Sequence, residues 1–374
     1  MSAPKLDEAW LKANIWPRFS RVLARKELYL ANHSLGRPPD RAAEDLRAAI
    51  YAWYSEMDRA WKIWTDGSER FRALTSRLVS ASRTDCIVPK TSAGQGLRAV
   101  LNALPGKPRV LTTDAEFDSI DLILRVYRDK GRIELKVLPF DSFRFEPCDL
   151  VVLSTVAFRT GKVCPSVEDV IKAAHGSKAM VLLDVYHHAG VLPLNLQALD
   201  ADFAVGGSYK YLRGGPGACW LYVHPRHHGL RTLDTGWFAK EDVFAYQRPE
   251  PPRFAPGGDA WLESTPPVLT PFQALAGLEI TLELGVERIR EYNLSQKQFL
   301  ASLLPVQGQK EDHGAFVTLK RENAKALAVA LERKGIKTDA RGEHLRICPD
   351  YLNSRDELAA AAAEVSALIK GGGR

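Results

Sequence analysis

Short apolar runs alternate with helical stretches along the chain from about residue 85 to residue 223. Apolar runs bounded by turn signals are typical of buried strands, whereas apolar residues spaced three and four apart indicate helices. This pattern predicts strands at 109–113, 134–138, 150–154, 180–185, 202–206 and 219–223. It predicts helices between them at 94–104, 119–130 and 166–175. Such alternation predicts an α/β fold with a mainly parallel sheet and helices on both faces.

The flanking regions show other patterns. Residues 28–38 predict a short strand that ends in a polar turn, and the region 248–258, rich in proline and glycine, predicts a loop. Helices are predicted at 40–64, 69–81 and 271–293, the last followed by a further helix through Leu304. Segments 314–319, 323–334, 345–348 and a helix from 354 suggest a small α+β unit. We therefore predict an N-terminal segment (1–40) that contributes to the small domain and the active site, a large domain (41–260), and a connecting helix with a small C-terminal domain (261–374).

Composition excludes several classes of protein. The 374 residues carry a formal net charge of +6, but the basic residues are dispersed and no basic run with interleaved aromatics is present, so a nucleic-acid partner is not expected. No apolar run is long enough to span a membrane, and no secretory signal is evident. The five cysteines are scattered, without a CxxC pair. They predict reduced thiols in a cytoplasmic protein and no metal site.

Two of the predicted strands deliver charged residues at their ends. The run 180–183 is followed by Asp184, and the run 203–205 leads to Tyr209 and Lys210 and then to a glycine-rich turn. Ligands of α/β sheets bind at the carboxyl ends of the strands. Pyridoxal phosphate (PLP) needs a lysine for its Schiff base and an acid beside its pyridine nitrogen, so the pair predicts a PLP site. Taken singly, Lys210 could be a surface lysine and Asp184 a helix cap.

Other residues could complete such a site. Thr91 and Ser92 precede a predicted helix, where hydroxyls and N–H groups bind phosphate, although an ordinary helix cap would look the same. Phe117 follows another strand and could cover a ring face or belong to the core. His187 could contact the cofactor or be a satisfied interior histidine. Arg346, inside an apolar strand, could clamp a substrate carboxylate or lie at a sheet edge.

Together these residues resemble the kynureninases, members of the class V aminotransferase group within the fold-type I PLP enzymes. The most specific matches are Asp184-x-x-His187, Ser208-Tyr209-Lys210-Tyr211-Leu212 and Gly215-Pro216-Gly217. Further matches are Tyr29-Leu30 with Ser34-Leu35-Gly36, Val156-Ala157-Phe158-Arg159-Thr160-Gly161, Gly236-Trp237-Phe238 and Ser264-Thr265-Pro266-Pro267. The resemblance is patchy but spans most of the chain.

The resemblance implies a large domain with a mainly parallel, seven-stranded sheet flanked by helices, and a small α+β C-terminal domain. In the PLP site that the resemblance implies, Lys210 would be the Schiff-base lysine and Asp184 would be the partner of the pyridine nitrogen. Tyr209 would hold the phosphate and take part in proton transfer. The other cofactor-binding residues would be Thr91, Ser92, Phe117, Thr155 and His187.

The resemblance also implies a homodimer with shared active sites, in which Trp237 and Thr265 reach the cofactor of the neighbouring subunit. Arg346 would hold the α-carboxylate of a small amino-acid substrate, with His33 and Ser34 as further substrate-binding residues. The implied reaction is the hydrolytic cleavage of the Cβ–Cγ bond of L-kynurenine, 3-hydroxykynurenine or a related substituted kynurenine. Its products are an anthranilate and L-alanine, in tryptophan catabolism.

The chain departs from the family at several positions. Asn32-His33-Ser34 replaces the usual Gly-Asn-Ser, Ile120 replaces an aspartate with Asp121 one place late, and Ala157 and Arg213 replace asparagines. The altered positions are those that face the substrate ring, whereas the cofactor-holding positions are kept. Two alternatives therefore stay open: another class V reaction (an aminotransferase, epimerase or lyase acting on a different amino acid, in secondary metabolism), and a non-catalytic PLP-binding protein. Cysteine desulfuration is disfavoured because Cys348 lies in an apolar strand.

Overall fold

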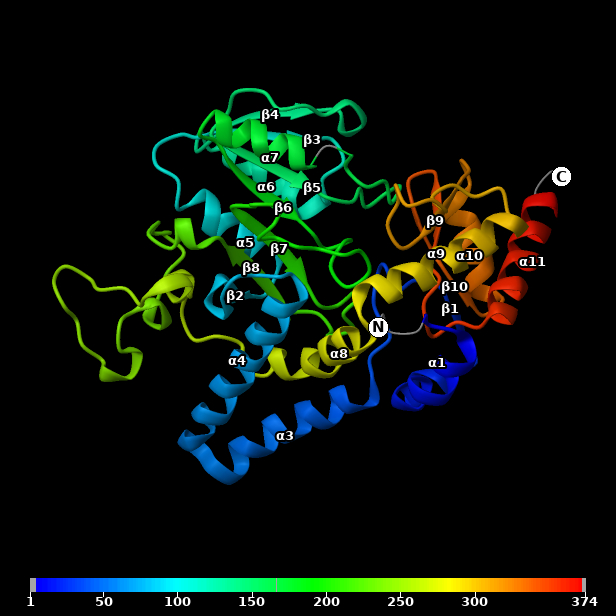
Figure 1. Ribbon diagram of the computed structural model, residues 1–374, viewed down its shortest axis with the longest axis horizontal. Helices are drawn as coiled ribbons and strands as arrows, with labels where there is room; N and C mark the ends of the chain where they lie inside the picture. The colour runs from blue at the N-terminus through cyan, green and yellow to red at the C-terminus, as the bar shows by residue number, and fades with distance from the viewer. Residues whose placement is uncertain (1–4, 166, 372–374) are drawn as a thin grey trace.

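A seven-stranded sheet in the order β2-β8-β7-β6-β5-β3-β4 forms the centre of the computed structural model, which describes residues 5–165 and 167–371 (Figure 1). Its strands are β2 (Ile87–Lys90), β3 (Arg109–Thr113), β4 (Glu134–Leu138), β5 (Leu150–Ser154), β6 (Met180–Asp184), β7 (Phe203–Gly207) and β8 (Cys219–Val223). Neighbours from β4 through β7 run parallel, and β8 is antiparallel to both β7 and β2. The predicted mainly parallel sheet is confirmed.

Helices cover both faces of this sheet. The α-helices of the chain are α1 (Glu8–Asn14), α2 (Ser20–Leu23), α3 (Asp40–Glu56), α4 (Ala60–Leu78), α5 (Ala93–Leu101), α6 (Asp118–Asp129), α7 (Val167–Gly176), α8 (Thr270–Leu284), α9 (Val286–Leu303), α10 (Ala324–Arg333) and α11 (Arg355–Gly371). Side chains of α4, α7 and α8 pack in one core cluster with the sheet, and those of α5 and α6 pack in another. The two clusters lie on opposite faces, as expected for an α/β fold.

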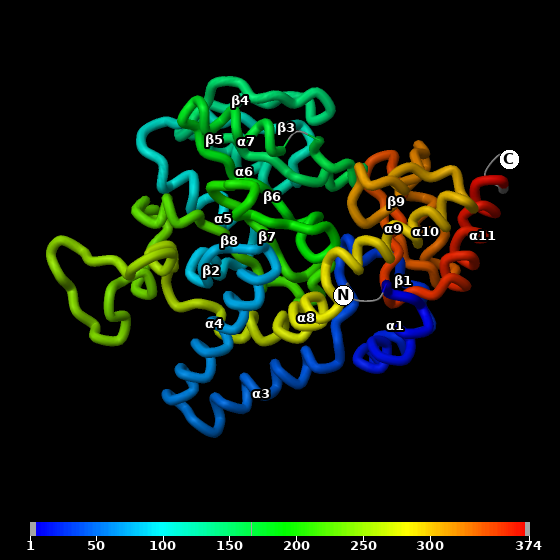
Figure 2. The backbone as a smooth tube through the Cα atoms, viewed as in Figure 1, coloured from blue at the N-terminus to red at the C-terminus, as the bar shows by residue number. Residues whose placement is uncertain are grey.

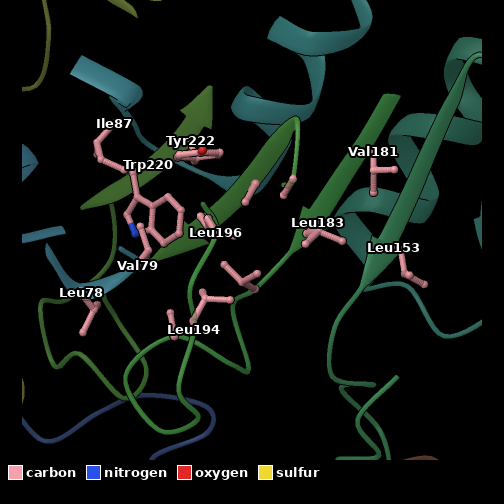
Figure 3. Close-up of a cluster of buried hydrophobic side chains, with 14 of the residues drawn as sticks. Leu78, Val79, Ile87, Leu153, Val181, Leu183, Leu194, Leu196, Trp220 and Tyr222 are labelled. Atoms are coloured by element: carbon pink, nitrogen blue, oxygen red, sulfur yellow. The ribbon is translucent and has the colours of Figure 1, made fainter. Parts of the chain in front are cut away.

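Strand residues alternate between the two clusters. Leu153 and Val181 join the cluster of α4, α7 and α8, whereas their chain neighbours Val152 and Leu182 join the cluster of α5 and α6. Figure 3 shows part of the first cluster, with Trp220 among its side chains. Because successive strand residues point to opposite faces, a strand covered on both sides is apolar throughout. This burial on two faces is why these strands are evident as continuous apolar runs.

A second, three-stranded antiparallel sheet lies near the C-terminus, in the order β11-β12-β9. Its strands are β9 (Val317–Lys320), β11 (Asp339–Arg341) and β12 (His344–Ile347). The N-terminal strand β1 (Leu28–Tyr29) pairs in parallel with β10 (Ile336–Lys337), and Ala31 bridges to Cys348. Glu8 accepts a hydrogen bond from the backbone N–H of Arg355, so the N-terminal segment runs beside the last helix (Figure 2).

Two helix boundaries predicted from the sequence are wrong. The single helix expected at 40–64 is broken between α3 and α4 by a short 3-10 helix, Met57–Arg59, whose first residue has φ of 51°. Both helices pack against α8, so their apolar spacing continues through the break. The hydrophobic pattern of the sequence therefore does not show where α3 ends and α4 begins. The helix expected at 271–293 ends earlier, because Gly285 (φ +80°) separates α8 from α9. A glycine in the left-handed region is a common helix terminator.

Strand β2 was not predicted. It is short and contains Pro89, which lacks an N–H donor, but it lies at the edge of the sheet, where a proline is tolerated. Strands β3, β4, β5 and β8 have the predicted bounds, and β6 and β7 differ from them by one residue. Helix α7 begins at Val167 among the described residues, and the predicted start at Ser166 lies outside them.

Candidate active site

Asp184 and Lys210 line one cavity at the carboxyl edge of the large sheet. Asp184 is the last residue of β6, and Lys210 follows β7, its parallel neighbour. Both side chains are almost fully buried, with 6% and 5% of their surfaces exposed. The backbone N–H of Tyr186 donates to Oδ1 of Asp184 at 2.9 Å. The neighbouring strand ends thus bring an acid and an amine into the same buried space, as predicted.

Burial makes Lys210 a nucleophile near neutral pH. Loss of solvent lowers the pKa of Lys210 to about 7; the Asp184 carboxylate opposes this shift and Arg346 adds to it. Lys210 Nζ lies 2.7 Å from His187 Nε2, and His187 Nδ1 lies 3.3 Å from the hydroxyl of Tyr211. Burial also lowers the pKa of His187 well below its ordinary value, with Lys210 and Arg346 adding to the effect. His187 is therefore a neutral partner of the amine at pH 7.

Burial shifts the pKa of Asp184 in the opposite direction to that of Lys210, because it disfavours the charged form of each group. Burial raises the pKa of Asp184, whereas the Tyr186 N–H and Lys210 lower it. A cationic partner inside the cavity would relieve the cost of keeping this carboxylate ionised. A protonated pyridine nitrogen is such a partner, so the donor set of the cavity fits PLP.

Aromatic rings form the walls around Lys210. Phe117, Tyr186 and Tyr209 have ring centroids 5.5–5.6 Å from Lys210 Nζ, and all three line the cavity. Phe158 also lines it and meets Phe117 edge to face, with centroids 5.5 Å apart. Such walls suit a flat ring, and Phe117 is one of the rings that form them.

Thr91 and Ser92 also line the cavity, directly before helix α5. Ser92 Oγ accepts a hydrogen bond from the N–H of Gln95 at 3.1 Å and caps the helix. The N–H and the hydroxyl of Thr91 both donate to Gln95 Oε1, at 2.7 and 3.1 Å. Gln95 in turn donates to Glu263, which pairs with the buried Lys90. Hydroxyls and amide groups at a helix N-terminus have the chemistry to bind a phosphate.

Thr155 supports the site from behind and does not line the cavity. Its hydroxyl donates to the backbone carbonyl of Asp184 at 3.2 Å and lies 3.2 Å from His188 Nδ1. The structure therefore places Thr155 in contact with the strand end that carries Asp184.

Arg346 is buried just outside the cavity and is already paired with an acid. Its Nε and Nη2 donate to the two carboxylate oxygens of Asp339 at 2.7 and 2.5 Å, and its Nη1 donates to the carbonyl of Phe158. A guanidinium has five N–H groups, so two remain without a partner among the residues that the structure describes. His33 Nε2 lies 2.8 Å from Asp339 Oδ1. Ser34 lies in a separate surface groove that Asp339 also lines.

Trp237 and Thr265 lie together in the connecting region of the chain. The indole N–H of Trp237 donates to Thr265 Oγ1 at 3.0 Å. Trp237 packs against Trp61 of α4, and Thr265 lines a second pocket that shares Thr91 with the cofactor cavity. Neither residue lines the cavity of its own chain.

Sequence reasoning missed Glu116, which is fully enclosed beside the cavity. It accepts hydrogen bonds from Thr113 Oγ1 (2.7 Å) and from Ser154 Oγ (2.6 Å) and N (3.1 Å). Burial raises the pKa of Glu116 to about 7, although these hydrogen bonds lower it, and the nearby Asp184 adds to the rise. Ser154 lines the cavity and is paired in register with Asp184. A carboxylate on either side of Ser154 makes this part of the site sensitive to pH.

Metal-binding clusters and membrane-spanning helices are both absent from the described residues. Within residues 5–165 and 167–371, no group of three or more His, Cys, Asp or Glu side chains is arranged to hold a metal ion. No helix in the described part of the chain is both long enough and apolar enough to cross a membrane.

Comparison with known proteins defines the family. Residues 41–353 match the aminotransferase class-V model, so the chain belongs to this family. The chain is 28% identical to the kynureninase of Deinococcus radiodurans over 373 residues, which covers 91% of this chain and 90% of the relative. It is 26% identical to the kynureninase of Geobacillus thermodenitrificans over 365 residues, covering 87% and 84%.

Solved structures confirm the fold. C-DES with glycine covalently linked to its PLP cofactor superposes with a TM-score of 0.85 at 19% identity, covering 94% of this chain and 98% of the other. A cysteine desulfurase from Escherichia coli superposes with a TM-score of 0.80 at 17% identity, covering 98% and 99%. The chain therefore has PLP fold type I and is a PLP-dependent, kynureninase-like enzyme.

Proposed function

We propose that the protein is a hydrolase that cleaves the Cβ–Cγ bond of L-kynurenine, or of a ring-substituted kynurenine, to an anthranilate and L-alanine. The observation that carries the proposal is the enclosure of Lys210, His187 and Asp184 by aromatic walls that suit an aryl substrate. Similarity to two kynureninases over about nine-tenths of the chain supports it. We further propose a role in tryptophan catabolism and a cytoplasmic location, the latter supported by five scattered cysteines that are all buried.

Bound PLP supplies an electron sink for the carbon that carries the substrate amine. Thr91, Ser92, the N-terminus of α5 and Tyr209 would hold its phosphate, and Asp184 would hold the proton on its pyridine nitrogen. Lys210, largely neutral at slightly alkaline pH, would bind the cofactor and would then move the Cα proton of the substrate. Burial raises the pKa of Tyr209 above its ordinary value, so its phenol keeps a proton that it can give to Cβ. Asp184 and Lys210 are buried, whereas Thr91 and Ser92 are exposed, so the amine and the acid are the groups shielded from bulk water.

We assign the substrate α-carboxylate to the two remaining N–H groups of Arg346. Asp339 and the Phe158 carbonyl fix the other three, so the guanidinium has one orientation. His33 Nε2 contacts Asp339 and has a pKa lowered to about 4, chiefly by burial, so we assign it a neutral supporting role. Ser34 would act at the edge of this region. The carboxylate clamp rests on bidentate recognition by arginine.

We also propose that two copies of the chain associate, with shared active sites. Tyr51, Trp53 and Tyr54 of α3 are largely exposed, at 70%, 56% and 80%. Phe244 and Tyr246 are also exposed, in the yellow-green segment that projects from the body of the molecule beyond α4 (Figure 1). Exposed apolar patches of this kind are typical of protein interfaces. A second copy is the proposed occupant because Trp237 and Thr265, next to this surface, lie outside the cavity of their own chain.

Product analysis tests the reaction. Incubation with L-kynurenine is expected to release fluorescent anthranilate and an equal amount of L-alanine. A keto acid in place of alanine would indicate transamination, and a cofactor-loaded protein that is inert across amino acids would indicate a binding protein. Sulfide release from cysteine is not expected, because burial raises the pKa of the Cys348 thiol to about 12 and all five cysteines are buried.

A further inference from the structure

Arg213 ends the loop that carries Lys210 and has an unusual backbone. Its φ is +60°, in the left-handed region that asparagine, the residue usual here in the family, adopts more readily than arginine. Its N–H donates to the carbonyl of Lys210 at 3.1 Å. Backbone strain of this kind persists only where the surrounding structure holds it in place, so contacts of the Arg213 side chain are expected to stabilise it.

The guanidinium of Arg213 is buried in a network of charges and hydrogen bonds. Its Nη2 donates to Asp350 Oδ1 at 2.5 Å, and its Nε donates to the hydroxyl of Tyr351 at 2.6 Å. The other oxygen of Asp350 accepts from Arg37 Nη2 at 3.1 Å. Burial alone would raise the pKa of Asp350, but the two arginines hold it below its ordinary value. The acid is thus ionised and shared between two arginines that are also buried.

This network joins three distant parts of the chain around the catalytic lysine. Arg37 follows Gly36, whose N–H donates to the carbonyl of Tyr209 at 2.7 Å. A side chain at Gly36 would place its Cβ 1.9 Å from the carbonyl oxygen of Lys210, so the two backbones are in direct contact. Asp350 and Tyr351 follow β12, the strand that carries Arg346. A buried ion pair adds little net stability, but it can specify one arrangement of the parts that it joins.

We propose that Arg213 is a positioning residue. Through Asp350 and Tyr351 it fixes the main chain of the Lys210 loop relative to the C-terminal sheet, so that Lys210 Nζ enters the cavity in a single direction. The strained backbone and the buried charge are both consequences of this one role. The role concerns the loop and not the substrate, and its test needs no substrate.

The test compares PLP-loaded wild type with Arg213→Asn, which removes the guanidinium and supplies a residue suited to the left-handed backbone. Hydrogen exchange of the peptides around 206–217 and 349–353 is expected to be about tenfold faster in the variant, with unchanged exchange in β3–β5. The midpoint of the pH titration of the bound cofactor's visible absorption is expected to shift by about 0.5 pH unit or more. Lys178→Asn is the matched control, because Lys178 has the same φ of 60° in an exposed turn without the network.

Tyr351→Phe provides a variant that keeps its fold, because it removes only the hydroxyl that accepts from Arg213. It is expected to change both readouts in the same direction as Arg213→Asn, by a smaller amount. Wild-type exchange in the Lys210 loop and a wild-type titration midpoint in Arg213→Asn overturn the proposal. If Arg213→Asn does not fold, the same wild-type values in Tyr351→Phe overturn it. A change equal to that of Lys178→Asn also overturns it, because relief of strain alone would then explain the result.

Discussion

The amine of Lys210 and the imidazole of His187 form a 2.7 Å contact inside a cavity with aromatic walls. Neither group carries a full positive charge there at pH 7, since burial lowers the pKa of both. An ordinary lysine would be almost wholly protonated at this pH. The pair therefore keeps a nucleophilic amine ready before any cofactor arrives.

This relationship predicts how the apoprotein takes up PLP. Only the neutral amine attacks the aldehyde, so the uptake rate is expected to rise about tenfold per pH unit below pH 7 and to level off above it. Stopped-flow absorbance at pH 5.5 to 10 measures the rate. The reaction of PLP with N-acetyl-lysine over the same range corrects for ionisation of PLP itself. A rate that keeps rising to pH 10 would contradict the lowered pKa of Lys210.

Asp184→Asn tests the pyridine partner. Asparagine keeps an oxygen for the Tyr186 N–H but removes the charge, so the fold is expected to remain while turnover falls on the order of 10²-fold. Cofactor affinity should also weaken, as measured by the fraction of protein that borohydride labels at a series of PLP concentrations. Thr155→Val, which only loosens the backbone behind Asp184, is expected to have a smaller effect. Turnover within threefold of wild type in Asp184→Asn would exclude the proposed role.

Glu116 gives the apoprotein a pH-dependent stability. Its pKa is about 7 when folded against an ordinary 4.5, so the folded state binds a proton that the unfolded chain has lost between these values. The stability that this proton contributes is complete below about pH 4.5 and is lost as pH rises to about 7, by up to about 3 kcal/mol. Glu116→Gln, which cannot titrate, is expected to flatten this dependence and to be the more stable protein at pH 8.

Thermal unfolding of the two apoproteins at pH 5, 6, 7 and 8 measures the effect. The amide oxygen that Glu116→Gln introduces would still accept from Thr113 and from the Ser154 N–H, so these hydrogen bonds need not be lost. Glu134→Gln, at an exposed position in β4, is the control and should follow the wild type. Parallel curves for wild type and Glu116→Gln would show that the carboxyl does not titrate in this range.

Arg346→Lys tests the carboxylate clamp. A lysine cannot reproduce the fork that engages Asp339 and the substrate together, so KM is expected to rise about tenfold or more with a smaller change in kcat. The neighbouring Arg341, which is exposed and lies 3.5 Å from Asp339, provides the matched control Arg341→Lys. An unchanged KM in Arg346→Lys would mean that the α-carboxylate binds elsewhere.

Mixing two inactive proteins tests the shared sites. Lys210→Ala lacks its own amine, and the double variant Trp237→Ala, Thr265→Ala lacks the residues expected to reach the partner. Random reassociation is expected to restore about one quarter of wild-type activity, because half of the dimers contain one intact site of two. Sedimentation of the wild type should show a dimer, and Tyr54→Glu should weaken it. No recovery in a mixture that demonstrably exchanges subunits would show that Trp237 and Thr265 do not complete the partner's site.

Much of the fold could be predicted because strands buried on both faces are continuous apolar runs. Asp184 and Lys210 were predictable as a pair for a related reason, since parallel strands end at one edge. The break at Met57 gave no signal, because a positive φ at a methionine depends on the packing of α3 and α4 against α8. In the sequence, Glu116 is an ordinary acid before a helix. Its burial beside Ser154 could not be predicted, because the contact between the two residues depends on the fold.

The ion pair between Arg346 and Asp339, like the contact of Glu116 with Ser154, depends on the fold and was not predicted. The two residues face each other across β11 and β12, and their contact follows from the register of that hairpin. The sequence shows an arginine inside an apolar strand but not which acid will neutralise it. Site residues that lie at the ends of parallel strands can be predicted to meet. Cross-strand pairs such as Asp339 and Arg346 are much harder to predict, because they depend on the register of the two strands.

The pairing of the N-terminal strand with segments near the C-terminus also has a consequence during synthesis. Leu28 pairs with Ile336 and Ala31 with Cys348. Residues 28–37 therefore cannot form these pairs until about three hundred further residues have been synthesised. Contacts of such high sequence separation form slowly, and a ribosome adds about 5–20 residues per second. The backbone contact between Gly36 and the Lys210 loop is therefore among the last parts of the molecule to assemble. A nascent chain cannot complete this support of the Lys210 loop until Cys348 has been synthesised.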